Sequence, residues 1–144
     1  MTKIKLKMRK ITLFIIHCSA VMPMQRSSAD DIDQWHRQKG WNGIGYHYVV
    51  RRDGSVEQGR PIEKVGAHCK NRNKHSVGIC YEGGLDKDGK PADTRTEAQK
   101  TALRELLEQL KKDHPNALIL GHNTFSNKAC PCFDVVREYR DLQP

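Results

Sequence analysis

Two short apolar runs, far apart in the chain, are each followed by a histidine. Residues 11–16 lead to His17, and residues 117–120 lead through Gly121 to His122. Short apolar runs of this kind are typical of strands that are buried on both faces of a sheet. We therefore expect residues 10–16 and 117–120 to be strands of one sheet, each with a histidine just beyond its end.

The loop that follows His122 carries two cysteines. It is polar and free of glycine, and it leads to Lys128, Cys130 and Cys132. Imidazole nitrogen and thiolate sulfur are ligands that zinc prefers, and a catalytic zinc normally has three protein ligands and one open position. The loop supplies two of these ligands, and His17 is the candidate for the third. Either cysteine could supply the sulfur, and the pair could also oxidise.

A hairpin is predicted in the first half of the chain. Residues 45–50 have the composition of a strand, and their alternation places Tyr46, Tyr48 and Val50 on one face. Asp53–Gly54 is a strong turn signal that leads into a returning strand over residues 55–57. Residues 77–81 form a further predicted strand.

Helices are predicted between these strands. We expect them over residues 28–39, 94–112 and 135–140, and Thr94-x-x-Glu97 resembles a capping box at the start of the clearest one. The order of elements predicts a single α/β domain with a mixed central β-sheet covered by two or three helices. With 144 residues the chain has room for one such domain, which we expect over residues 11–144 after a basic tail over residues 1–10.

The net charge of +8 limits the choice of partners only in part. It attracts polyanions, but nucleic acid, anionic membrane and anionic cell wall all satisfy it equally. The sequence has neither a basic platform interleaved with aromatic residues nor a helix-turn-helix signal, so we expect no specific nucleic-acid binding.

Cysteine spacing and the N-terminal sequence bear on the compartment. Five cysteines without a C-x-x-C pair favour reduced thiols or a metal site over a disulfide framework. The lysine-rich start and the apolar run imitate a signal peptide, but the run is too short and His17 interrupts it. No stretch approaches the length of a transmembrane helix. We therefore expect a monomer that is made in the cytoplasm without a signal peptide.

Several short motifs occur in a characteristic order. They are Ile15-Ile16-His17-Cys18-Ser19, Gly40-Trp41, Ile44-Gly45-Tyr46-His47-Tyr48, Asp53-Gly54-x-Val56, Gly59-Arg60, Val65-Gly66-Ala67-His68, Asn73-x-x-Ser76-Val77-Gly78-Ile79, Gly121-His122 and Lys128-Ala129-Cys130-Pro131. The series, from about residue 11 to 134, resembles the zinc-dependent N-acetylmuramoyl-L-alanine amidases of the type 2 amidase and peptidoglycan-recognition superfamily. The branch that it resembles most contains the short phage lysozymes that are amidases.

The resemblance implies a zinc site and two catalytic residues. It implies that His17, His122 and Cys130 bind Zn²⁺, and that Tyr46 and Lys128 are catalytic. We expect the lysine ammonium to stabilise the oxyanion or to transfer protons, and the tyrosine hydroxyl to reach the zinc water or the substrate carbonyl. Taken alone, Lys128 could be an ordinary surface lysine, and Tyr46 could be a core residue.

Three further positions match residues that line the substrate groove of the family. Trp41, His68 and Asn73 are candidates for contacts with the stem peptide or the muramyl group. Trp41 could equally belong to the core, and His68 could order a loop. The neighbouring His47 is expected to be structural.

One position separates the branches of the family. Cytosolic enzymes that recycle anhydro-muropeptides resemble this chain over residues 76–79 but carry a glutamate next, where this chain has Cys80. This difference favours the phage-lysozyme branch. Glu82 lies two residues further on and is kept as a reserve candidate for a general base.

The expected function is hydrolysis of the amide bond between N-acetylmuramic acid and L-alanine in peptidoglycan. The enzyme would act on the cell wall in a phage or prophage setting. A non-catalytic peptidoglycan-binding module is an alternative, but such relatives have usually lost the cysteine ligand, and Cys130 is present here. A second alternative is a regulator of a phage RNA polymerase, for which the basic residues 1–10 could serve as an interface.

Overall fold

A computed structural model describes residues 9–144. The five strands are β1 (Leu13–Cys18), β2 (Tyr48–Val50), β3 (Val56–Gln58), β4 (Ser76–Tyr81) and β5 (Leu118–Gly121). The three α-helices are α1 (Ala29–Gln38), α2 (Glu97–Asp113) and α3 (Val135–Glu138). Short 3₁₀ turns cover Asn73–His75, His122–Thr124 and Arg140–Leu142. Residues 1–8 of the predicted basic tail lie outside the described part, so the predicted domain division stays a prediction.

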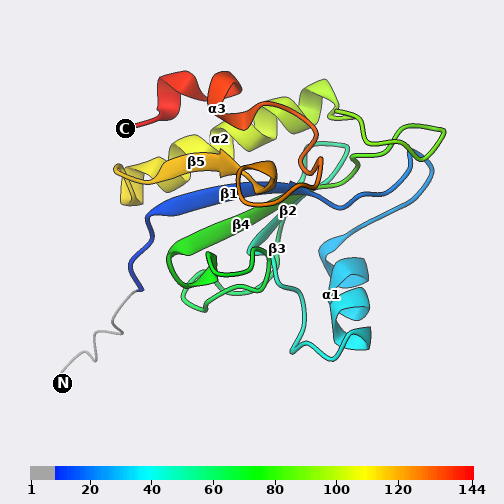
Figure 1. Cartoon of the computed structure of the whole chain (residues 1–144), viewed down its shortest axis with the longest axis horizontal. Helices are drawn as coiled ribbons and strands as arrows, with labels where there is room; N and C mark the ends of the chain where they lie inside the picture. The colour runs from blue at the N-terminus through cyan, green and yellow to red at the C-terminus, as the bar shows by residue number, and fades with distance from the viewer. Residues whose placement is uncertain (1–8) are drawn as a thin grey trace.

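The strands form one mixed sheet in the order β3-β2-β4-β1-β5. β1 is parallel to both β4 and β5, β2 is parallel to β4, and β3 is antiparallel to β2. The β2–β3 pair is the predicted hairpin, and α1 lies between β1 and β2 in the chain while α2 lies between β4 and β5 (Figure 1). The predicted α/β class with a mixed central sheet is therefore confirmed.

Helices cover both faces of the sheet, with α2 and α3 on one face and α1 on the other (Figure 1). Phe14 and Ile16 of β1 pack with Leu103 and Leu107 of α2, and all four side chains are fully buried. Burial of each such side chain contributes about 1.5–3 kcal/mol. Because side chains alternate along a strand, His17 points to the opposite face of the sheet. Within residues 9–144, none of the helices has the length and apolar character needed to cross a membrane.

The start of α2 differs from its prediction. Its N-cap is Thr96 and not Thr94: the Thr96 side chain accepts a hydrogen bond from Gln99 N, and the Gln99 side chain accepts one from Thr96 N. Thr94 Oγ1 instead accepts a hydrogen bond from Gly84 N at 2.8 Å. The capping box is therefore present two residues later, with glutamine in the place of glutamate. At α1 the Ser28 cap lies where the sequence predicts it.

The strand predicted over residues 45–50 is also shorter than expected, because β2 begins at Tyr48. Tyr46 packs with the core cluster on the α1 face, whereas Tyr48 and Val50 pack on the α2 face. The prediction that the three share one face is therefore wrong. Gly45 and Tyr46 lie outside the ladder and accept backbone hydrogen bonds from the loop over residues 60–67, which breaks the alternation.

Glu82, which directly follows β4, accepts hydrogen bonds from three donors in two other segments of the chain. Its carboxylate accepts hydrogen bonds from Ser27 N at 2.6 Å, Arg51 Nε at 3.0 Å and Arg52 N at 3.0 Å. Burial opposes ionisation, but these donors outweigh it, and the pKa of Glu82 lies below its usual value. These three donors engage the carboxylate. We therefore do not assign Glu82 the general-base role for which the sequence made it a candidate.

We expect Glu82→Gln to lower the free energy of unfolding by about 2–4 kcal/mol at pH 7, because it removes a buried charge from its donors. Since the folded-state pKa is lowered, the stabilisation is present above the unfolded pKa and disappears as the pH falls through the folded one. The difference between variant and wild type should therefore shrink in acid. Urea unfolding across this pH range measures it.

The matched control is Glu105→Gln, which alters an exposed carboxylate on α2. It should change stability by less than about 0.5 kcal/mol. Equal effects of the two substitutions would contradict the anchoring role of Glu82.

Candidate metal centre

The parallel neighbours β1 and β5 bring two histidines together. Ile16 pairs with Gly121, so the next residue of each strand, His17 and His122, lies at the same edge of the sheet. The two rings are 4.6 Å apart between centroids. His17 is 1% exposed, whereas His122 begins a 3₁₀ turn at the surface and is half-buried.

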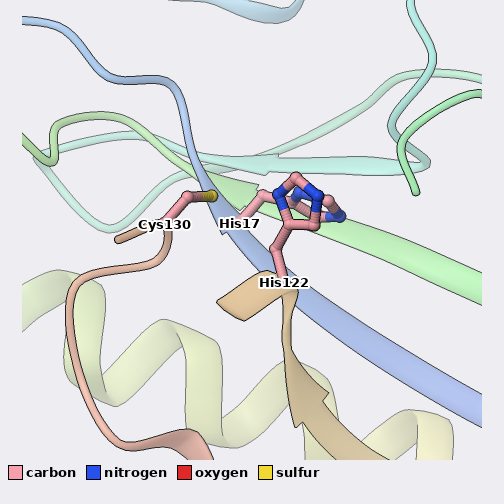
Figure 2. A group of neighbouring side chains, drawn as sticks. All are labelled: His17, His122 and Cys130. Atoms are coloured by element: carbon pink, nitrogen blue, oxygen red, sulfur yellow. The ribbon is translucent and has the colours of Figure 1, made fainter. Parts of the chain in front are cut away.

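The loop over residues 122–134 returns a sulfur to these rings. One ligand atom each from His17, His122 and Cys130 lie within 4.8 Å of one another. Figure 2 shows the Cys130 sulfur directed towards the two imidazoles. Cys18 N donates a hydrogen bond to Cys130 Sγ at 3.2 Å, which fixes the loop to the end of β1. Two nitrogens and one sulfur in this proximity form the donor set of a zinc site with one open position.

Cys132 does not join this cluster. It has a left-handed backbone conformation (φ +71°), and its Sγ donates a hydrogen bond to Gly84 O at 3.4 Å. Burial, together with the nearby Cys18, raises the pKa of Cys132 to about 12, so the thiol keeps its proton. The loop sequence alone allowed either cysteine to be the ligand. In the structure, Cys130 is the one that lies beside the histidines.

A hydrogen-bonded chain of side chains supports His17 from behind. His17 Nε2 lies 2.9 Å from His68 Nδ1, and His68 Nε2 lies 3.1 Å from Ser76 Oγ. The His68 ring packs over Gly78, where a Cβ atom would approach it to 2.5 Å, so this approach requires glycine. Burial lowers the pKa of His17 well below its usual value and that of His68 to about 3. Both rings are therefore neutral, so His17 can act as a metal ligand and His68 can accept the hydrogen bond of its second nitrogen.

Asn73 orders the loop that carries His68. Its Oδ1 accepts hydrogen bonds from the backbone N–H groups of His68 and Cys69, at 2.9 and 3.0 Å. The sequence offered Asn73 and His68 as substrate contacts. The structure gives each of them a positioning contact as well.

A groove of about 450 Å³ opens beside the cluster. It is lined by His36, Lys39, Trp41, Tyr46, Ala67, His68, Cys69, Lys70, Asn73, His122 and Lys128. All five residues that the sequence assigned to catalysis or substrate binding therefore meet in one groove with a candidate metal ligand. Trp41 is 41% exposed and belongs to the groove wall and not to the core.

Tyr46 and Lys128 lie close to the candidate ligands. The Tyr46 ring is 5.0 Å from the His17 ring, and burial raises the pKa of Tyr46 well above its usual value, so the phenol remains a donor. Lys128 is exposed. It lines the groove together with His122, and burial, followed by the charge of Lys128, lowers the pKa of His122.

Among the groove residues to which the sequence analysis gave no role are His36, Lys39 and Lys70. His36 lies on α1 and is 9% exposed, and its Nδ1 accepts a hydrogen bond from Gly45 N at 2.9 Å. Its ring lies 4.5 Å from that of Trp41. The spacing of His36 and Lys39 on one helix face just before Trp41 is the local signal that could have found two of them.

Comparisons with known proteins agree with this geometry. The sequence matches the family model for N-acetylmuramoyl-L-alanine amidase over residues 7–133. It is 43% identical over 138 residues to an endolysin of Klebsiella phage KP32, an alignment that covers 95% of this chain and 91% of that protein.

Solved structures give the same result. The N-acetylmuramoyl-L-alanine amidase LysC from Clostridium intestinale superposes with a TM-score of 0.78 at 27% identity, over 93% of this chain and 86% of that one. The complex of peptidoglycan recognition proteins LCa and LCx with tracheal cytotoxin gives a TM-score of 0.76 at 25% identity, over 96% and 86%. The chain therefore belongs to the N-acetylmuramoyl-L-alanine amidase family.

Proposed function

We propose that this protein is a zinc-dependent phage lysis enzyme that hydrolyses the amide between N-acetylmuramic acid and L-alanine in peptidoglycan. Family membership and the similarity to phage endolysins support the reaction and the setting. The observation that carries the proposal is the cluster of His17, His122 and Cys130, of which His122 also lines the groove. Similarity to peptidoglycan recognition proteins in complex with tracheal cytotoxin supports the groove as the binding site.

The donor set fits zinc in chemistry and in protonation. When bound, zinc would supply a water molecule whose pKa is lowered to about 7. Ligation through His17 Nδ1 would leave Nε2–H to donate to His68 Nδ1, and His68 Nε2–H would donate to Ser76 Oγ. A histidine ligand normally has such a partner for its second nitrogen.

The remaining roles fall to Lys128 and Tyr46. Negative charge develops on the carbonyl oxygen as an amide is attacked, and an ammonium beside it stabilises that charge. Lys128, exposed near His122 and lining the groove, is the cation for this role. The Tyr46 hydroxyl keeps its proton and supplies a neutral hydrogen-bond donor on the His17 side.

The alternatives have less support. A non-catalytic binding module would not need the cysteine ligand, the lysine and the tyrosine, and this chain retains all three. The polymerase regulator follows from the resemblance to the phage branch, with residues 1–10 as a candidate interface. Most of these residues lie outside the described part, so this partner stays a prediction. A pull-down against the cognate polymerase tests it.

Removal of a ligand should remove both metal and activity. We expect Cys130→Ser and His122→Ala to lower zinc content from one ion per chain to near zero, because two remaining ligands hold zinc weakly. Zinc content by metal analysis and muropeptide cleavage by mass spectrometry measure the two effects. Cys132→Ser is the matched control and should retain both. Stoichiometric zinc and full turnover in either ligand variant would show that the ligand set is wrong.

Lys128→Ala should separate catalysis from metal binding. The variant should keep one zinc per chain and lose about 10²–10³-fold in kcat, the usual effect of removing one group that stabilises the oxyanion. Single-turnover cleavage of a soluble muropeptide measures the rate. Lys74→Ala, outside the groove, serves as the control. A turnover equal to that of the wild type would remove Lys128 from the mechanism.

His68→Phe should weaken zinc binding while it leaves all three ligands in place. The phenyl ring keeps the packing over Gly78 but cannot accept the His17 hydrogen bond, and loss of such a partner typically costs about 10–100-fold in metal affinity. Competition with a chromophoric chelator measures the affinity, and the exposed His75→Phe is the control. An unchanged zinc affinity would show that His68 does not support His17.

A further inference from the structure

The groove beside the candidate metal centre has an unbalanced charge. Three lysines, Lys39, Lys70 and Lys128, line it, and its described lining contains neither aspartate nor glutamate. Lys128 lines the groove together with the candidate ligand His122 and already has a role in the proposed reaction. The reaction itself gives no role to Lys39 or Lys70.

These two lysines are held by different elements. Lys39 is the C-cap of α1, and its Nζ lies 5.6 Å from the centre of the Trp41 ring. Lys70 is exposed in the loop whose backbone Asn73 fixes through His68 and Cys69. Each ammonium is therefore attached to an ordered part of the groove wall.

Among residues 9–144, no carboxylate forms an ion pair with either lysine. Ion pairs in the described part of the chain engage arginines such as Arg51, Arg95 and Arg104, and also Lys100, but they include neither Lys39 nor Lys70. Within residues 9–144, neither ammonium group takes part in a side-chain hydrogen bond, so both are free to bind a ligand. A ligand carboxylate would form charge-assisted hydrogen bonds with them, whereas an uncharged amide would gain much less.

We propose that Lys39 and Lys70 are specificity-determining residues that bind free carboxylates of the stem peptide, so that the groove selects acidic over amidated stem peptides. The inference rests on the proposed function, which puts the amide of L-alanine at the metal end. The stem peptide then extends along the groove, where its later residues meet the two lysines.

The test compares two muramoyl tripeptides. One carries free carboxylates on its second and third residues, and in the other these groups are carboxamides. For the wild type we expect a KM roughly tenfold lower for the acidic form, with kcat equal within about twofold, since each exposed charge pair contributes a few-fold. Lys39→Gln and Lys70→Gln should each raise the KM for the acidic form about threefold, and the double variant should lose the preference.

Binding of the released tripeptides gives a second readout that needs no turnover. Calorimetry should show tighter binding of the acidic tripeptide to the wild type, weaker at high salt, and equal binding of both forms to the double variant. Lys112→Gln removes the same charge from α2, a helix that packs on the other face of the sheet, and should retain the preference.

The outcomes separate this inference from the proposed function. Equal kcat/KM and equal affinity for the two forms would overturn the inference and leave the amidase intact. A preference for the acidic form that survives in the double variant would also overturn the inference. So would a loss of that preference in Lys112→Gln as large as the loss in the double variant. Absence of cleavage together with selective binding that the double variant loses would overturn the amidase and support the lysine assignment.

Discussion

Parallel pairing of β1 with β5 is the contact on which the metal centre depends. Parallel neighbours end at the same edge of a sheet, so the register of Ile16 with Gly121 is what joins His17 to His122. The register is itself fixed by burial. A shift of one residue would turn Phe14 and Ile16 out of the α2 core and turn His17 into it, at a cost of several buried side chains. The apolar core therefore determines the geometry of the polar site.

The third ligand and the surroundings are held by contacts that are not part of the sheet. Cys18 N–H fixes the Cys130 sulfur, and His68 supports His17 from the opposite side. The His68 ring can approach only because Gly78 lacks a side chain. Burial keeps both imidazoles neutral, so His17 does not need to lose a proton before it binds a cation. A site held in this way is organised before metal or substrate arrives.

Local patterns in the sequence predicted the elements well, and non-local contacts account for the errors. The apolar runs before His17 and His122 indicated strands because burial of a strand leaves a local trace. The shift of the α2 cap from Thr94 to Thr96 depends on Gly84, a residue ten positions away in the chain. The face of Tyr46 depends on a loop that pulls the backbone out of the ladder. Neither Gly84 nor this loop lies within the short stretch of sequence from which each local prediction was made.

The candidate site shows the same division. Spacing alone left Cys130 and Cys132 as equal candidates, and only the folded loop sends one sulfur to the histidines and the other to Gly84 O. The resemblance to the amidases supplied the roles of Lys128 and the groove positions. It did not supply a role for Lys39 or Lys70. These lysines lie on different elements, and only the fold brings both of them to one groove.

The structure shows where the net charge of +8 is neutralised by ion pairs and where it is not, which composition alone cannot show. Arg95, whose side chain is 1% exposed, pairs with Asp93 and Glu138, and the Arg51 charge is met by Glu57 and Glu82. Such pairs cancel locally and contribute little to the field outside the molecule. The groove instead combines neutral imidazoles at its base with lysines that have no acidic neighbour in its lining. Concave walls of one sign concentrate the field, and this is the physical basis on which the two proposed lysines would favour an anionic peptide.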